Sequence, residues 1–226
     1  MGKKRIDPKI QKLQSKKWDS MEKCKKLQNK WGDYNSFSED PNKSNKIVII
    51  NELKRVCGII GKESSVLEVG CGAGHFMWVI KDLVKENHGM DYSKPMLTLT
   101  KEQFEKNNYK VFLKQGSCWN LPYNDNSFDF VFQVDVCMHI GGSWESIKEM
   151  IRVSKRFVFF TGPSFENFID MINKKISGGK RWSISVPLLK RELEIMKKKE
   201  IIKEYKFFYR EPTKYYNHKI LIIEKI

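Results

Sequence analysis

The feature that most constrains the fold is a short apolar run that ends in glycines and leads into a helical pattern. The run, SVLEV, covers residues 65–69, and glycines follow at Gly70, Gly72 and Gly74. Apolar side chains then recur with helical spacing over residues 76–84. This order predicts a strand, a tight turn and a helix. Glycines without side chains let a ligand touch the backbone where the helix begins.

The same order recurs along the chain, which predicts an α/β protein. Ser93 is the expected cap of a helix that has Pro95 in its first turn. Strands are expected to end near residue 91 and to cover 110–114, 128–136 and 157–161, with a helix over 144–153. Strands that alternate with helices predict a parallel sheet covered on both faces. After Pro187 we expect a helix to about residue 199 and a hairpin of strands 201–210 and 219–226, with its turn around Pro212.

The first sixty residues follow another pattern. Apolar residues between Ile10 and Trp31 form a helical stripe among lysines, and a second helical pattern covers 44–57 before Gly58 and Gly61. We therefore predict a helical extension over residues 1–60 and one domain over residues 61–226. No internal repeat or low-complexity linker interrupts that domain.

The amino-acid composition excludes several classes of protein. The chain has 226 residues, of which 40% are hydrophobic and 31% charged, so it can bury a sizeable core and is neither a disulfide miniprotein nor a disordered chain. Its five cysteines include no C-x-x-C pair and its four histidines are scattered, which predicts neither a disulfide framework nor a bound metal. No apolar run approaches the roughly 18 residues of a membrane span, and the basic N-terminus has no apolar region behind it. We expect a cytoplasmic protein.

The net charge of +15 is concentrated at the two ends of the sequence. Residues 1–30 hold 11 Lys and Arg against 3 acidic residues, and residues 174–226 hold 15 against 6. The middle of the chain is close to neutral. Two interpretations stay open: an anionic partner, or lysines that lie on solvated faces.

The spacing of the glycines separates two classes of nucleotide site. A dinucleotide fingerprint places its third glycine one position later, as G-x-G-x-x-G. Here Gly74 comes early, and residues 66–76 resemble the first motif of class I methyltransferases that depend on S-adenosylmethionine (SAM). Residues 89–93 resemble the end of that family's second strand. Residues 115–129, QGSCWNLPYNDNSFD, resemble its segment G-D-A-x-x-L-P-F-x-D-x-S-F-D.

The resemblance covers about residues 62–160 and implies a fold and a cofactor. The fold is Rossmann-like, with a mostly parallel seven-stranded sheet and a C-terminal antiparallel hairpin. The cofactor is SAM, which leaves as S-adenosylhomocysteine (SAH). Asp91 matches the residue that accepts from the ribose hydroxyls, and Glu68 matches the acid near the methionine end. The residues implied in cofactor binding are Glu68, Gly70, Cys71, Gly72, Gly74, Asp91, Tyr92, Ser117, Cys118, Trp119 and Gln133.

Some of these residues also have plainer interpretations. Asp91 could instead cap the helix that begins near Ser93, and Trp119 could simply fill core. Ser117 stands where the family often has an aspartate that accepts from the adenine amino group. The backbone N–H of Cys118 could still reach the ring.

His139 is the candidate catalytic base. It follows the expected strand 128–136, and open α/β sheets bind ligands at the C-terminal ends of their strands. SAM carries its own electrophile, so placing the acceptor can supply most of the rate and a base is optional. His139 could therefore act as a base, or only position the acceptor.

Absent motifs and the distribution of charge limit the classes of methyl acceptor. No [NDS]-P-P-[YF] tetrapeptide occurs, which disfavours methyltransferases of adenine and cytosine amino groups, and no Pro-Cys dipeptide points to a cytosine C5 nucleophile. The first hypothesis is transfer to an O or N atom of a small anionic molecule, with Lys180 and Arg181 at its entrance. The others are an RNA methyltransferase, a non-catalytic methyltransferase-like subunit and, disfavoured by Gly74, an NAD-dependent oxidoreductase.

Overall fold

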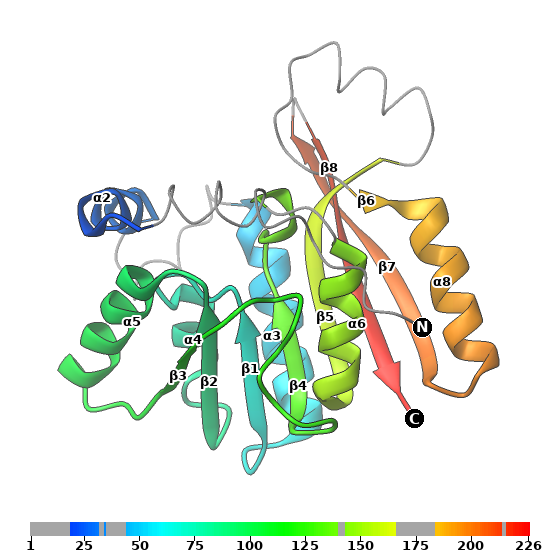
Figure 1. Ribbon diagram of the computed structural model, residues 1–226, viewed down its shortest axis with the longest axis horizontal. Helices are drawn as coiled ribbons and strands as arrows, with labels where there is room; N and C mark the ends of the chain where they lie inside the picture. The colour runs from blue at the N-terminus through cyan, green and yellow to red at the C-terminus, as the bar shows by residue number, and fades with distance from the viewer. Residues whose placement is uncertain (1–18, 32–33, 35–43, 140–142, 166–183, 214–215) are drawn as a thin grey trace.

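The computed structural model describes residues 19–31, 34, 44–139, 143–165, 184–213 and 216–226, in which strands and helices largely alternate (Figure 1). The helices are α2 (Met21–Trp31), α3 (Ser44–Ile60), α4 (His75–Ile80), α5 (Lys94–Lys106), α6 (Ser143–Val153) and α8 (Val186–Lys198), with a 3-10 turn η3 (Cys137–His139). The strands are β1 (Ser65–Val69), β2 (Glu86–Asp91), β3 (Phe112–Gln115), β4 (Phe128–Gln133), β5 (Ser154–Phe165), β6 (Ile184–Ser185), β7 (Ile202–Thr213) and β8 (Tyr216–Lys225).

All these strands belong to one sheet, whose main path runs in the order β3-β2-β1-β4-β5-β8-β7. The pairs from β3 to β5 are parallel, while β8 is antiparallel to both β5 and β7. The short β6 pairs with β5 beside this path. The predicted fold class is confirmed: a mostly parallel sheet carries a C-terminal antiparallel hairpin, as Figure 1 shows.

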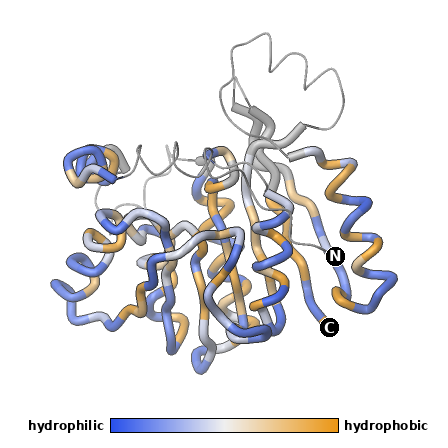
Figure 2. Tube along the Cα trace, in the orientation of Figure 1, coloured by the Kyte–Doolittle hydropathy of each residue, from blue (hydrophilic) through white to orange (hydrophobic). Residues whose placement is uncertain are grey.

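The sheet is buried on both faces because its strands alternate between two apolar clusters. In β5, Val158 and Phe160 belong to one cluster, and Phe157 and Phe159 to the other. Figure 2 shows the hydrophobic residues gathered on the strands and the hydrophilic ones along the outer turns of the helices. A strand that is apolar on both faces is the pattern of a sheet covered by helices on either side.

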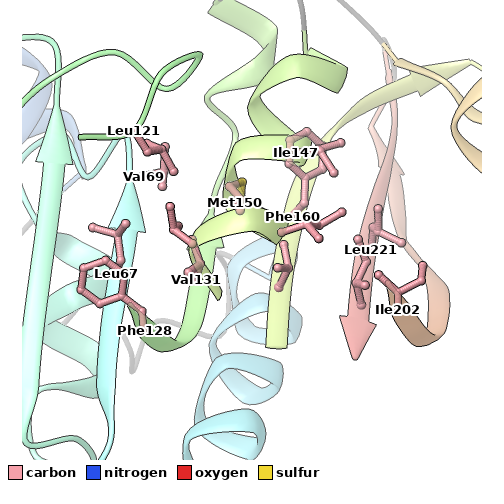
Figure 3. Packing of buried hydrophobic residues seen from close by; sticks show 14 of the residues in the cluster. Leu67, Val69, Leu121, Phe128, Val131, Ile147, Met150, Phe160, Ile202 and Leu221 are labelled. Carbon is pink, nitrogen blue, oxygen red and sulfur yellow. The ribbon is translucent and has the colours of Figure 1, made fainter. Parts of the chain in front are cut away.

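Helices from different parts of the sequence cover the two faces. α6 and α8 contribute Ile147, Met150 and Leu193 to the cluster that contains Leu67, which Figure 3 shows from close by. α3 contributes a buried stripe to the other cluster. That stripe consists of Ile49, Leu53 and Val56, all fully buried. The domain boundary at residue 60 stays a prediction, and α3, before it, packs on the sheet.

Two elements near the glycine turn end earlier than predicted. α4 stops at Ile80, because the chain must return to the sheet, where the Lys85 and Glu86 amides donate to the Ser64 carbonyl at 3.0 and 3.2 Å. β4 stops at Gln133, since Asp135 adopts a φ of 55°, which breaks the extended conformation before η3 begins. Left-handed backbone of this kind is uncommon outside glycine.

One glycine and one proline that the sequence predicts to interrupt regular structure lie inside a helix and a strand. Gly58 lies inside α3, which ends at Ile60 just before Gly61 with its φ of 82°. Pro212 lies within β7 rather than in the hairpin turn. The predicted acceptor-side residues Lys180 and Arg181 lie outside the described residues. In the part of the chain that the structure describes, none of the helices has the length and apolar character needed to cross a membrane.

Candidate cofactor site

The glycine turn after β1 is tied to the end of β2. The amides of Gly70 and Cys71 both donate to the Met90 carbonyl, at 2.7 and 3.1 Å. Gly70 has a φ of 76°, and a Cβ built on it would lie 2.4 Å from the Val136 Cγ2 atom. A side chain at this position would therefore collide with the segment that follows β4. Glycine is required at position 70 because the Val136 side chain packs directly against its backbone.

Gly72 differs because the space beside it is open. Its φ is 54°, and a Cβ built on it would meet no atom within 4 Å. Its amide donates to the Asp91 Oδ2 atom at 2.8 Å, and its carbonyl accepts from the Thr100 hydroxyl at 2.8 Å. Two hydrogen bonds thus hold the Gly72 backbone, and the space where a side chain would stand is open.

Asp91 ends β2 with its carboxylate on this turn. Besides the Gly72 amide, it accepts from the Ser93 amide at 2.8 Å through Oδ1. Burial raises the pKa of Asp91, and the bonds from Ser93 and Gly72 oppose that shift. The side-chain cap of α5 is Ser93, whose hydroxyl accepts from the Met96 amide at 3.3 Å. Asp91 is therefore not the side-chain cap of α5. An ionised carboxylate has about four acceptor sites, which leaves room for a ligand hydroxyl beside its bonds to the backbone amides of Gly72, Tyr92 and Ser93.

Glu68 and Cys71 are buried close to Asp91. Glu68 is 2% exposed, and its carboxylate accepts from the Met77 amide at 3.2 Å. Burial raises the pKa of Glu68 well above the usual range, and the charge of Asp91 adds to the effect. Burial likewise raises the pKa of the Cys71 thiol well above its usual range. A thiol of that kind does not supply the thiolate that nucleophilic catalysis requires.

Sequence reasoning missed Tyr34, which covers the glycine turn. Its hydroxyl donates to the Ala73 carbonyl at 2.6 Å, and Gln28 of α2 donates to that hydroxyl at 3.0 Å. The Tyr34 ring stacks on His75, the first residue of α4, with ring centroids 4.2 Å apart. Gly74, which lies between Ala73 and His75 in the sequence, is the N-cap of α4. Tyr34 carries no signal in the sequence because it lies in a polar, turn-rich stretch.

The connection between β3 and β4, residues 116–127, holds Ser117, Cys118 and Trp119. The Ser117 hydroxyl accepts from the Trp119 amide at 3.4 Å, and the indole N–H of Trp119 is buried with no hydrogen-bond partner among the described residues. Burial raises the pKa of the Cys118 thiol to about 12, with an opposing hydrogen bond to Ser146. Tyr92, beside this connection, is 44% exposed and accepts at its carbonyl from Gln115.

Gln133, at the end of β4, carries a second buried donor without a partner. Its side chain is fully buried, and its Oε1 atom accepts from the Ser146 hydroxyl at 2.8 Å. Its Nε2 atom has no hydrogen-bond partner among the described residues. Trp119 belongs to the β3–β4 connection, and Gln133 is linked to it through Ser146, which also hydrogen-bonds Cys118. A ligand with nitrogen or oxygen acceptors, such as a purine, matches this donor set.

His139 lies in η3, beyond the end of β4. Its backbone amide donates to the Val136 carbonyl at 2.9 Å, and its side chain is half-buried. Nearby, the Thr161 hydroxyl of β5 donates to the Asp135 carboxylate at 2.9 Å and accepts from the Asp135 amide at 3.1 Å. His139 is thus at the C-terminal edge of the sheet, and its role stays a prediction. The described residues contain no group of three or more His, Cys, Asp or Glu placed to hold a metal ion.

Comparisons with known proteins agree with this geometry. Residues 67–159 match the methyltransferase domain family. An uncharacterized methyltransferase, YcgJ of Bacillus subtilis, is 29% identical over 121 residues, which are 50% of this chain and 48% of the relative. The demethylmenaquinone methyltransferase of Bacillus mycoides is 33% identical over 96 residues, 41% of this chain and 40% of that enzyme. The chain therefore spans about half or less of the length of these curated relatives.

A solved structure is similar over a longer stretch. The magnesium protoporphyrin IX methyltransferase of Synechocystis, crystallised with bound SAH, superposes with a TM-score of 0.70. The superposition covers 96% of this chain and all of that one, at 13% sequence identity. The structure of YcgJ gives a TM-score of 0.57 over 76% of this chain and 98% of that chain, at 16% identity. At such low identity these likenesses establish the shared fold.

Proposed function

Since the chain belongs to the class I methyltransferases that depend on SAM, we propose that it transfers the methyl group of SAM to an O or N atom of a small molecule. The relatives named above act on demethylmenaquinone and on magnesium protoporphyrin IX, which are both small molecules. That favours a small acceptor over RNA.

One observation carries the proposal: the open space at Gly72 borders the Asp91 carboxylate. The Gly72 amide and Asp91 Oδ2 are 2.8 Å apart, and no atom beyond the two chain neighbours lies within 4 Å of a Cβ built on Gly72. A ribose whose hydroxyls donate to Asp91 would place its adenosine against bare backbone. The methionine end would then lie toward Glu68, and the base toward Cys118, Trp119 and Gln133.

When bound, SAM supplies an electrophilic methyl group on a positively charged sulfur. The protein's task is to orient the cofactor and the acceptor and to exclude water, which can contribute about 7–11 kcal/mol in favourable cases. Tyr34, 4% exposed over the glycine turn, is placed to keep water away from the backbone of Ala73. Burial raises the pKa of Glu68, which favours its protonated form, and in that form the carboxyl can donate a hydrogen bond to the methionine end of the cofactor.

His139 is proposed to face the acceptor at the mouth of the site. An imidazole there would take the proton released from a hydroxyl or ammonium acceptor, a contribution of roughly 10²–10⁴-fold. His139→Ala should then lower kcat and leave SAM affinity unchanged. An equal loss of both would assign His139 to cofactor binding.

The acceptor is proposed to be anionic, with a phosphate, phosphonate or carboxylate. The support is the net charge of +15, concentrated at the two ends of the sequence. A small anion that touches one or two cations should lose little affinity between 50 and 200 mM salt, whereas several RNA phosphate contacts would cost about 10³-fold. Lys180→Gln with Arg181→Gln should raise the acceptor KM. Unchanged constants for the true acceptor would leave these cations without a role.

Calorimetry tests the cofactor. We expect SAM and SAH to bind with one site per chain and NAD to bind weakly or not at all. Tight NAD binding without SAM binding would defeat the proposal.

A further inference from the structure

The β3–β4 connection, residues 116–127, has to hold its shape without a helix. It carries three of the proposed cofactor residues, Ser117, Cys118 and Trp119, and consists of turns and bends between Gln115 and Phe128. Long connections without regular structure depend on specific contacts to keep one conformation. Two charged residues of α6, Glu149 and Arg152, make four hydrogen bonds to it, and Lys114 and Lys225 make one each.

Arg152 reaches three groups on the connection. Its Nη1 atom donates to the Tyr123 carbonyl at 2.9 Å and to the Asp125 carboxylate at 2.7 Å. Its Nη2 atom donates to the Leu121 carbonyl at 3.0 Å. The planar guanidinium, with its fixed fork of donors, suits such multiple contacts in a way that a lysine ammonium does not.

Glu149 orients Arg152 and binds the connection directly. Its carboxylate accepts from Arg152 Nε at 3.0 Å and from Nη2 at 2.8 Å, a bidentate pair. It also accepts from the Leu121 amide at 2.8 Å. The two side chains are only 12% and 30% exposed, so water screens the pair weakly. Leu121 is therefore held by the pair at both its amide and its carbonyl, and its side chain is buried in the core beside Val69 (Figure 3).

The opposite end of the proposed base site is fixed by the sheet. The Gly116 amide donates to the Asp91 carbonyl at 3.1 Å. Between the two anchors, Gly116 and Leu121, residues 117–120 form a turn in which the Asn120 amide donates to the Ser117 carbonyl at 3.1 Å. Without the Leu121 anchor, this part of the connection would keep the Gly116 bond, the bond between Cys118 and Ser146, and the bond from Lys114 Nζ to the Pro122 carbonyl at 2.9 Å.

We propose that Glu149 and Arg152 are positioning residues, which hold the β3–β4 connection in the conformation that receives the base of the cofactor. The inference rests on the proposed function for the identity of the ligand. Neither residue is assigned a contact with the ligand. Their effect acts through Leu121, Tyr123 and Asp125.

The chain supplies a matched control in Arg55. Arg55 and Glu52 of α3 form an ion pair with the same spacing of three residues, joined by one hydrogen bond of 2.8 Å. Arg55 is 48% exposed, and its hydrogen bond is to Glu52 of the same helix, away from the connection. Arg55→Gln removes a similar charge pair without touching the proposed site.

The test compares Arg152→Gln, Arg152→Lys, the double variant Glu149→Gln with Arg152→Gln, and Arg55→Gln. Hydrogen exchange reports on the amides of residues 117–121 and of Tyr123, since Pro122 has no N–H. Calorimetry reports on SAH affinity, and thermal unfolding on stability. We expect faster exchange over 117–123 and an SAH affinity at least tenfold weaker in Arg152→Gln. Arg152→Lys should fall between this variant and the wild type, because it keeps the charge but loses the fork. Arg55→Gln should match the wild type in exchange and affinity.

The double variant guards against a simple folding defect, because it leaves no uncompensated buried charge. If Arg152→Gln does not fold, the double variant and Arg152→Lys decide the matter. A folded variant with a lower unfolding temperature but unchanged exchange over 117–123 and SAH affinity within twofold of wild type would overturn the inference. If the wild type itself does not bind SAH, the proposed function fails, and the exchange data alone support or overturn the anchoring role.

Discussion

The C-terminal ends of β1 and β2 and the β7–β8 hairpin belong to one sheet but differ in the side chains that they place away from solvent. At the C-terminal ends of these strands, Glu68 is buried and Asp91 is half-buried, beside backbone held at positive φ. In the hairpin, residues 220–223 place aliphatic side chains alternately on the two faces. Buried carboxylates oppose folding unless they are hydrogen-bonded, whereas buried aliphatic groups favour it. The hairpin side of the sheet thus supplies stability for a costly binding edge.

The first test removes packing from the hairpin. Leu221 is 1% exposed and belongs to the cluster shown in Figure 3, so Leu221→Ala should lower the free energy of unfolding by about 2–5 kcal/mol. SAH affinity of the folded protein should not change. Denaturant unfolding and calorimetry measure the two quantities. Ile226→Ala, at a residue 69% exposed, is the control and should be nearly neutral.

The second test, at the binding edge, should change SAH affinity, which the first test leaves unchanged. Asp91→Ala removes a charged acceptor proposed to bind two hydroxyls, and such hydrogen bonds are each worth about 1.5–3 kcal/mol. SAH affinity should fall at least tenfold by calorimetry. Asp82→Asn is the control, since Asp82 bonds Tyr109 and Lys81 at the surface. An Asp91 variant with wild-type affinity would confine this carboxylate to its bonds with Gly72 and Ser93.

The third test separates two glycines of the same turn. Gly70→Ala puts a methyl group 2.4 Å from Val136, so it should destabilise the fold. Gly72→Ala meets no protein atom and costs only the strain of a positive φ, about 1–2 kcal/mol, but its methyl group would enter the proposed ligand space. We expect Gly72→Ala to weaken SAH binding more than it lowers the unfolding temperature. The opposite order of effects would assign the open space to solvent.

The fourth and smallest effect concerns pH. Burial raises the pKa of Glu68, so above the ordinary glutamate pKa of about 4.3 the folded chain holds a proton that the unfolded chain has lost. The contribution of Glu68 to stability should therefore fall as the pH rises from that value toward the raised pKa. Glu68→Gln should show a flatter pH dependence of unfolding free energy. A wild-type profile that rises over this window in parallel with the variant would argue for an ionised Glu68.

Local patterns predicted the sheet because each element carries its own signal. Alternating apolar residues, the glycine turn and the Ser93-Pro95 cap are contiguous in sequence, and the structure contains each of them. The end of β4 was not predictable, because the left-handed Asp135 is stabilised by Thr161, 26 residues away in sequence. Tyr34 and the Arg152 contacts likewise depend on partners brought close only by folding.

The central claim is that adenosine lies against Gly72 with its ribose on Asp91. A crystal structure of the chain with SAH tests it most directly. The account predicts ribose hydroxyls within hydrogen-bond distance of the Asp91 carboxylate, with the base beside Cys118 and Trp119. Density for SAH at another place on the chain, or an Asp91 carboxylate that contacts only backbone amides of its own chain in the complex, would contradict it.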